Sequence, residues 1–172
     1  MRRHGQGEKR RGDIEKFRMV FRATPGDVRK TLDRFCSHIR PLSLPAEYTG
    51  TLELVLAEVL NNVVEHAYGN RGDGWIELCA TMLDNGFAFE VVDEGAEMPE
   101  QELPRGDPRL LGGDLNALPE GGFGWFLIRD LAQDLSYERR NERNYLAFRI
   151  CRNIPAARQT APCETGCRIR CR

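Results

Sequence analysis

Apolar residues recur with two different periods along the chain, and each period predicts one kind of secondary structure. Alternation of apolar and polar positions predicts five strands, at residues 17–23, 75–82, 87–92, 135–139 and 145–151. Helical spacing predicts three helices, which run from Pro25 to the stop at Pro41, onward from Pro45, and over residues 123–132. Thr24 is expected to cap the first helix, because Pro25 suits the first helical position.

The order of these elements predicts the fold class. Asn85-Gly86, between the second and third strands, is a hairpin signal, and the last two strands also follow each other directly. We therefore expect an α+β two-layer sandwich, with a mixed, mostly antiparallel sheet and three helices on one face, and not a doubly wound parallel sheet. Residues 95–122 lack periodicity and are rich in glycine and proline. A connection of this length is typical of a functional lid.

The charge is unevenly distributed along the 172 residues, whose net charge is −1. Residues 1–13 carry +3 and residues 152–172 carry +4, which leaves −8 on residues 14–151. This distribution predicts one acidic domain at 14–151 between two basic, disordered arms. The alternative for the arms is weak docking to an acidic partner. The near-neutral total argues against a dedicated nucleic-acid binder.

Hydropathy predicts a cytoplasmic protein. The most apolar helix, at residues 52–64, is interrupted by Glu53, Glu58, Asn61 and Asn62, so no stretch approaches the roughly 18 apolar residues of a membrane span. The N-terminus has charges but no apolar core of a signal peptide. We therefore expect no membrane partner.

The six cysteines fall into two groups. Cys36, Cys79 and Cys151 lie within apolar-periodic segments, which predicts buried reduced thiols. The others are Cys163, Cys167 and Cys171, spaced by four in the C-terminal arm, where no histidine completes a zinc set. An unstructured arm is the favoured interpretation, and a cysteine-rich redox or metal regulator attached to the domain is the alternative.

Three segments carry residues suited to phosphate chemistry. Spacing by four places a carboxylate, an amide and an imidazole on one face of the second helix. An aspartate ends the third strand, where a carboxylate can accept a hydrogen bond from an amine. Glycines open the third helix, where backbone N–H groups can approach phosphate oxygens. The residues are Glu58, Asn62 and His66; Asp93, Glu94 and Gly95; and Gly121, Gly122, Phe123 and Gly124.

In these segments residues 17–151 resemble the GHKL ATPase superfamily, and within it the anti-sigma factor serine kinases of the RsbW type. Residues 58–68, which end in His-Ala-Tyr, are similar to the N-box of that family, and residues 93–95 and 121–128 to its two glycine boxes. The resemblance implies a Bergerat-type fold that binds Mg-ATP beneath a mobile lid. Glu97 stands where many members have a second glycine, and Trp125 where leucine is commoner.

The resemblance also implies a role for each site residue. Asn62 would coordinate Mg²⁺, which needs few protein ligands because phosphates and water complete its shell. Glu58 would take the proton of the attacking hydroxyl. Asp93 would bind the adenine amino group and Gly95 would allow close approach of the base. Gly122 and Gly124 would present backbone donors to the phosphates of ATP.

The function implied by the resemblance is an ATP-dependent kinase that phosphorylates a serine or threonine of an anti-anti-sigma (STAS-type) protein and sequesters a sigma factor, as a homodimer. The alternative is a nucleotide-dependent binding module of the same fold without phosphotransfer. The sequence has no P-loop motif and no H-R-D or D-F-G pair, which excludes those kinase and NTPase classes. Residues around His38 faintly resemble a phosphoacceptor box, but only about 20 residues separate it from Glu58, too few for a second dimerisation helix.

Overall fold

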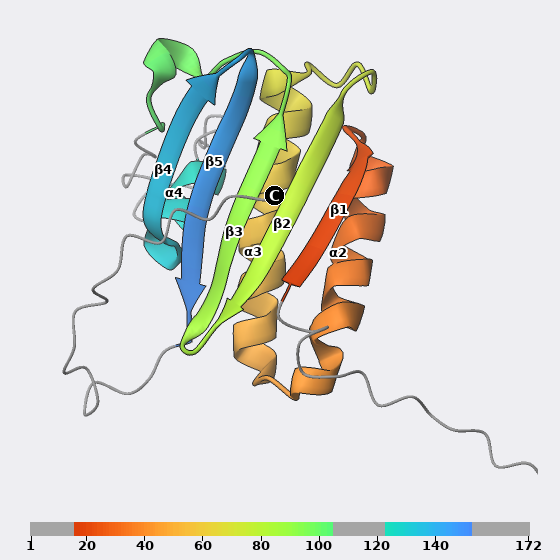
Figure 1. The fold of residues 1–172 in the computed structure, drawn as a ribbon, viewed down its shortest axis with the longest axis vertical. Helices are drawn as coiled ribbons and strands as arrows, with labels where there is room; N and C mark the ends of the chain where they lie inside the picture. The colour runs from red at the N-terminus through yellow and green to blue at the C-terminus, as the bar shows by residue number, and fades with distance from the viewer. Residues whose placement is uncertain (1–15, 105–122, 153–172) are drawn as a thin grey trace, which may run out of the picture.

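The structure, a computed structural model, describes residues 16–104 and 123–152. Five strands form one antiparallel sheet in the order β1-β2-β3-β5-β4, and helices α2, α3 and α4 cover one of its faces (Figure 1). The elements in chain order are β1 (Lys16–Arg22), α2 (Pro25–Ile39), η1 (Arg40–Leu42), α3 (Ala46–Asn62), η2 (Val63–Ala67), β2 (Trp75–Leu83), β3 (Gly86–Asp93), η3 (Pro99–Gln101), α4 (Phe123–Leu131), β4 (Gln133–Arg140) and β5 (Arg143–Cys151). The predicted α+β sandwich is confirmed, and every strand pair is antiparallel.

Helix α2 begins where its capping residues predict. The hydroxyl Oγ1 of Thr24 accepts a hydrogen bond from the backbone N–H of Asp27 at 3.1 Å, and Pro25 follows the cap. This bond satisfies one of the N–H groups that a helix leaves free at its start. The buried face of α2 packs on the sheet, where the ring of Phe35 meets those of Phe87 and Phe89 edge to face.

Helix α3 is a regular α-helix only as far as Asn62. It passes at Val63 into a π-helical turn, η2, in which the N–H of Tyr68 donates to the carbonyl of Val63 at 3.1 Å. At the end of this turn the carbonyl of Ala67 accepts a hydrogen bond from the N–H of Ala96, in the segment that follows β3. At the other end of α3, the buried hydroxyl of Tyr48 donates to the carbonyl of Ile150 in β5 at 2.7 Å.

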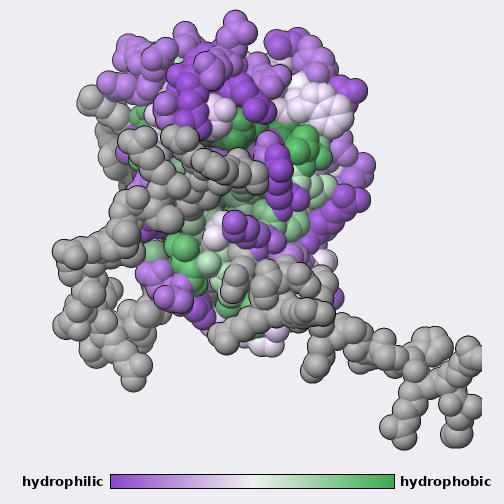
Figure 2. All heavy atoms as spheres, in the orientation of Figure 1, coloured by the Kyte–Doolittle hydropathy of each residue, from purple (hydrophilic) through white to green (hydrophobic). Residues whose placement is uncertain are grey.

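The core lies between the helices and the central strands, and β3 is buried along its whole length. The opposite face of the sheet, seen in Figure 2, carries hydrophilic side chains at one end and hydrophobic ones nearer its middle. Trp75 is 50% exposed there, with the Arg22 guanidinium 4.5 Å from the ring centroid. Such a stack covers part of an exposed ring.

The cysteine prediction is only partly right. Cys36 and Cys151 are outside any disulfide, as predicted, but they are only half-buried. Cys79 is buried as predicted, but it is disulfide-bonded and not a reduced thiol, since an apolar pattern reports burial and not pairing. Both predicted arms, apart from Arg152, lie outside the described residues, and so do the three cysteines of the C-terminal arm. The same holds for residues 105–122 of the predicted lid. Within the described ranges no helix is both long and apolar enough to cross a membrane.

Candidate functional site

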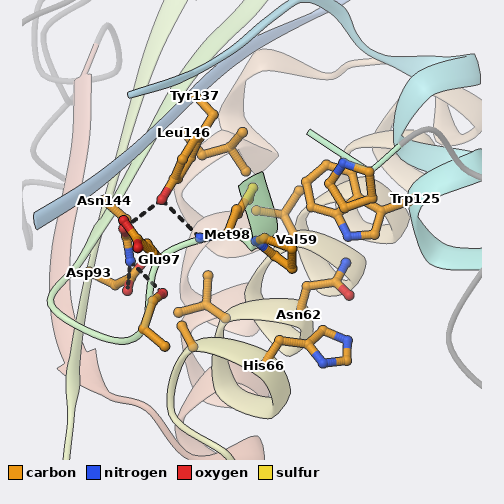
Figure 3. A pocket seen from close by; sticks show the side chains of 15 residues that line it. Val59, Asn62, His66, Asp93, Glu97, Met98, Trp125, Tyr137, Asn144 and Leu146 are labelled. Atoms are coloured by element: carbon orange, nitrogen blue, oxygen red, sulfur yellow. Dashed lines mark hydrogen bonds between the residues drawn. The ribbon is translucent and has the colours of Figure 1, made fainter. Parts of the chain in front are cut away.

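One cavity of about 350 Å³ lies where the end of α3, the end of β3 and the beginning of α4 meet. Asp93, Asn144 and Tyr137 stand at one end of it, and Asn62, His66 and Trp125 at the other (Figure 3). Apolar side chains lie between the two polar ends, among them Val59, Met98 and Leu146. An apolar cavity with a few placed polar groups is the usual form of a small-molecule site.

Asp93 is the buried carboxylate of this cavity and is only 5% exposed. Its Oδ1 accepts two hydrogen bonds, from the backbone N–H of Gly95 and from Nδ2 of Asn144, both at 2.8 Å. Burial raises the pKa of Asp93 above its ordinary value, although these two hydrogen bonds oppose the change. Since no described residue donates to Oδ2, that oxygen is available as an acceptor for a ligand.

Asn144 organises the polar end of the cavity, and the sequence analysis did not single it out. It lies opposite Asp93 in the β3–β5 register and is 4% exposed. Its Oδ1 accepts from the hydroxyl of Tyr137 at 2.8 Å and from Nη1 of Arg139 at 2.7 Å. The sequence does contain a signal for Asn144, because this residue is in phase with the inward positions Leu146, Phe148 and Ile150. A polar residue at an inward position needs hydrogen-bond partners.

Glu58 and Asn62 both reach the beginning of α4. A Cβ atom added at Gly124 would lie 3.5 Å from Cδ of Glu58, with a carboxylate oxygen closer still, and 3.7 Å from Nδ2 of Asn62. Nδ2 of Asn62 is buried and has no hydrogen-bond partner among the residues described. Burial, and secondarily the charge of Glu65, raises the pKa of Glu58. The glycine thus makes room for two polar side chains at a helix N-terminus.

Gly95 is required by the fold itself. A Cβ at this position would lie 2.6 Å from the carbonyl oxygen of Ala67, which accepts a hydrogen bond from the N–H of Ala96 at 2.8 Å. The resemblance implies that this glycine allows close approach of a base; in the structure the backbone of η2 also lies against it. Tyr68 fixes the same junction, because its hydroxyl donates to the carbonyl of Trp75 and accepts from the N–H of Glu94, each at 2.9 Å.

The donor set fits Mg²⁺ only together with a ligand that brings its own oxygens. In the described part of the chain, no group of three or more His, Cys, Asp or Glu side chains could hold a metal ion. Asn62, whose amide has an unpartnered buried atom, and the nearby Glu58 carboxylate offer few oxygens. Mg²⁺ bound to phosphates and water needs no more than this from the protein.

The three predicted segments therefore converge. The first contributes Glu58 and Asn62, the second Asp93 and Gly95, and the third Gly124. Gly121 and Gly122 lie outside the described residues. Three residues singled out for other reasons are also placed. Glu97 and the buried Trp125 line the cavity. His38 packs against Phe17, with their ring centroids 5.3 Å apart.

Comparisons with known proteins show the family of this chain. A family model described as "Histidine kinase-like ATPase domain" matches residues 21–150. The chain is 26% identical over 119 residues to "Blue-light-activated histidine kinase 2" of Erythrobacter litoralis, a match covering 69% of this chain and 31% of that protein. It is 34% identical over 99 residues to "Serine/threonine-protein kinase BtrW" of Bordetella bronchiseptica, covering 57% and 67%. Because the family model spans well over half its length, the chain belongs to the histidine kinase-like ATPase family.

Proposed function

We propose that this protein is an ATP-dependent kinase that phosphorylates a serine or threonine on an anti-anti-sigma (STAS-type) protein and also sequesters a sigma factor. The observation that carries the phosphotransfer is the Glu58 carboxylate beside Asn62 and the N-terminus of α4. Similarity to a protein named a serine/threonine-protein kinase supports the class of acceptor. The His-Ala-Tyr ending at residues 66–68 supports the anti-sigma branch and its two partners.

The polarity of the cavity suggests how ATP lies in it. Oδ2 of Asp93 accepts from the exocyclic amine of adenine, and the apolar middle of the cavity covers the faces of the base. The triphosphate then extends toward Asn62 and Gly124. The free N–H groups at the beginning of α4 carry partial positive charge and suit phosphate oxygens.

Glu58 acts as the general base in this proposal. A pKa raised by burial makes a carboxylate a stronger proton acceptor, and it accepts the proton of the attacking serine or threonine hydroxyl. Asn62 would hold Mg²⁺, which when bound would supply charge neutralisation on the phosphates. The chain's own contribution is then positioning, which together with electrostatic stabilisation accounts for most of phosphoryl-transfer catalysis.

The second candidate is a binding module of the same fold, whose nucleotide state sets its affinity for a partner without transfer. The same cavity would serve, but a module has no need of a carboxylate at the phosphate end. The presence of Glu58 beside Gly124 therefore favours the kinase.

Transfer of label from γ-labelled ATP to purified STAS-type proteins tests the proposal. We expect transfer by the wild type, loss of transfer in Glu58→Gln, and retained nucleotide affinity in that variant. Glu53→Gln is the matched control, because Glu53 lies on the same helix but is exposed. A wild type that binds ATP tightly and transfers nothing would establish the binding module instead.

Cytoplasmic location, which the hydropathy of the sequence favours, and a homodimeric state, which the resemblance to the anti-sigma branch implies, complete the proposal. Light scattering of the purified chain, with and without Mg-ATP, tests the dimer. A monomer at all accessible concentrations would contradict it.

A further inference from the structure

We propose that Asn144 is the positioning residue for recognition of the adenine base. By occupying Oδ1 of Asp93 it leaves Oδ2 as the acceptor that faces the ligand, and through the carbonyl of Ala96 it fastens the segment that follows β3 to β5. The inference rests on the proposed contact between Asp93 and the adenine amine, and it adds a residue that determines which base is accepted.

The first part of the argument is the hydrogen bonding of the Asp93 carboxylate. Nδ2 of Asn144 and the N–H of Gly95 both donate to Oδ1, so that oxygen is saturated by the protein. Two donors on one oxygen also fix the rotation of the carboxylate about its Cβ–Cγ bond. Removal of the Asn144 donor would leave only the Gly95 bond, about which the carboxylate can turn.

The second part is the orientation of the Asn144 amide, which its partners define. Tyr137 and Arg139 supply protons to Oδ1, so Nδ2 must face Asp93. Nδ2 also donates to the carbonyl of Ala96 at 3.0 Å, and lies 3.4 Å from the carbonyl of Gly95. Every polar atom of this buried side chain is therefore used.

The third part is the link to the segment that follows β3. The hydroxyl of Tyr137 donates to Asn144 and accepts from the backbone N–H of Met98 at 3.0 Å (Figure 3). Nη1 of Arg139 donates to the carbonyl of Gly95 at 3.0 Å. Because Ala96, Glu97 and Met98 line the cavity, the network also fixes the wall against which a base would lie.

Base selection follows from the chemistry of the free oxygen. A carboxylate oxygen accepts hydrogen bonds and donates none, so it binds the 6-amino group of adenine and leaves the 6-oxo group of hypoxanthine without a donor. Discrimination of this kind is strong when the polar group of the site is buried, because the wrong ligand leaves it unpaired. The orientation imposed by Asn144 is what presents Oδ2 to that position.

The test compares dissociation constants for Mg-ATP and Mg-ITP, measured by calorimetry, in the wild type, Asn144→Leu, Tyr137→Phe and Asp93→Asn. We expect the preference for ATP over ITP to fall about 10-fold in Asn144→Leu, the usual effect of one lost hydrogen bond to a charged group. Tyr137→Phe should reduce it by a smaller factor. A general loss of structure would weaken both nucleotides equally and leave the ratio unchanged.

Tyr145→Phe is the matched control, since Tyr145 neighbours Asn144 but its ring faces Arg140, 3.9 Å from the centroid. Its ATP:ITP ratio should equal that of the wild type. If Asp93→Asn loses the preference while Asn144→Leu and Tyr137→Phe keep it, the role of Asn144 is wrong and the Asp93 contact stands. If Asp93→Asn also keeps the preference, the proposed base contact is wrong as well. Should Asn144→Leu not fold, a full wild-type ratio in Tyr137→Phe would overturn the inference.

Discussion

Replacement of Gly124 by alanine tests the geometry at the phosphate end of the cavity. The added methyl group would meet the nearer carboxylate oxygen of Glu58 well inside the 3.4–4 Å range of ordinary contact, whereas Nδ2 of Asn62, at 3.7 Å, lies within that range. Glu58 must therefore move and Asn62 need not. The obstacle is the end of a flexible side chain, so the fold can accommodate the change.

The size of the effect follows from the displacement. The carboxylate must withdraw by about 1 Å, and a misplacement of that size can reduce a catalytic rate on the order of 100-fold. Affinity for Mg-ATP should change little, because the backbone N–H of residue 124 and the Asn62 amide remain in place. Single-turnover transfer from labelled ATP gives the rate, and calorimetry gives the affinity.

Gly50→Ala is the matched control for this variant. Gly50 lies in α3, as Glu58 does, and a Cβ there would have nothing within 4 Å. It should leave transfer unchanged and raise the free energy of unfolding by about 0.5–1 kcal/mol, since alanine is the better helix former. A full transfer rate in Gly124→Ala, with transfer absent in Glu58→Gln, would show that the position of Glu58 is not fixed by α4.

Three further outcomes are expected. Gly95→Ala should lower the free energy of unfolding by about 1–3 kcal/mol in urea denaturation, because its Cβ would press on the backbone of Ala67, and unchanged stability would contradict that contact. Burial raises the pKa of Asp93, so affinity for Mg-ATP should fall as the pH is lowered through that raised pKa, and an affinity that does not change with pH would contradict this. The contribution of Asp93 to the free energy of unfolding has the opposite dependence, because it is lost as the pH rises through the same pKa. In a Trp75→Phe background, Trp125 is the remaining tryptophan, and its emission should change on addition of Mg-ATP; an unaltered spectrum at saturation would place the ligand elsewhere.

Much of the site could be predicted because its residues follow periodic elements. The spacing of four between Glu58 and Asn62 requires only one helical turn, and both side chains reach Gly124 as that spacing predicts. Asp93 could be placed because it ends an apolar strand. The antiparallel order followed from two short connections, which leave a parallel crossover no room.

The parts that could not be predicted depend on contacts between distant segments. The π-helical turn at Val63 arises where the end of α3 meets the β3 terminus through Ala67 and Gly95, and no local pattern reports that contact. Asn144 was missed because the last strand was expected to begin at Tyr145, whereas β5 begins two residues earlier, at Arg143. Its importance lies in pairing across the sheet with Asp93, which only the register defines.

The central claim is that α3, the end of β3 and the beginning of α4 together hold one Mg²⁺-chelated adenine nucleotide. Calorimetric titration of ATP, with Mg²⁺ and with a chelator, into the wild type, Asn62→Ala and Asp93→Asn measures this directly. We expect Mg²⁺ to strengthen ATP binding to the wild type and Asp93→Asn but not to Asn62→Ala, and the preference for adenine to be lost in Asp93→Asn alone. Wild-type affinity, Mg²⁺ dependence and base preference in both variants would contradict the account.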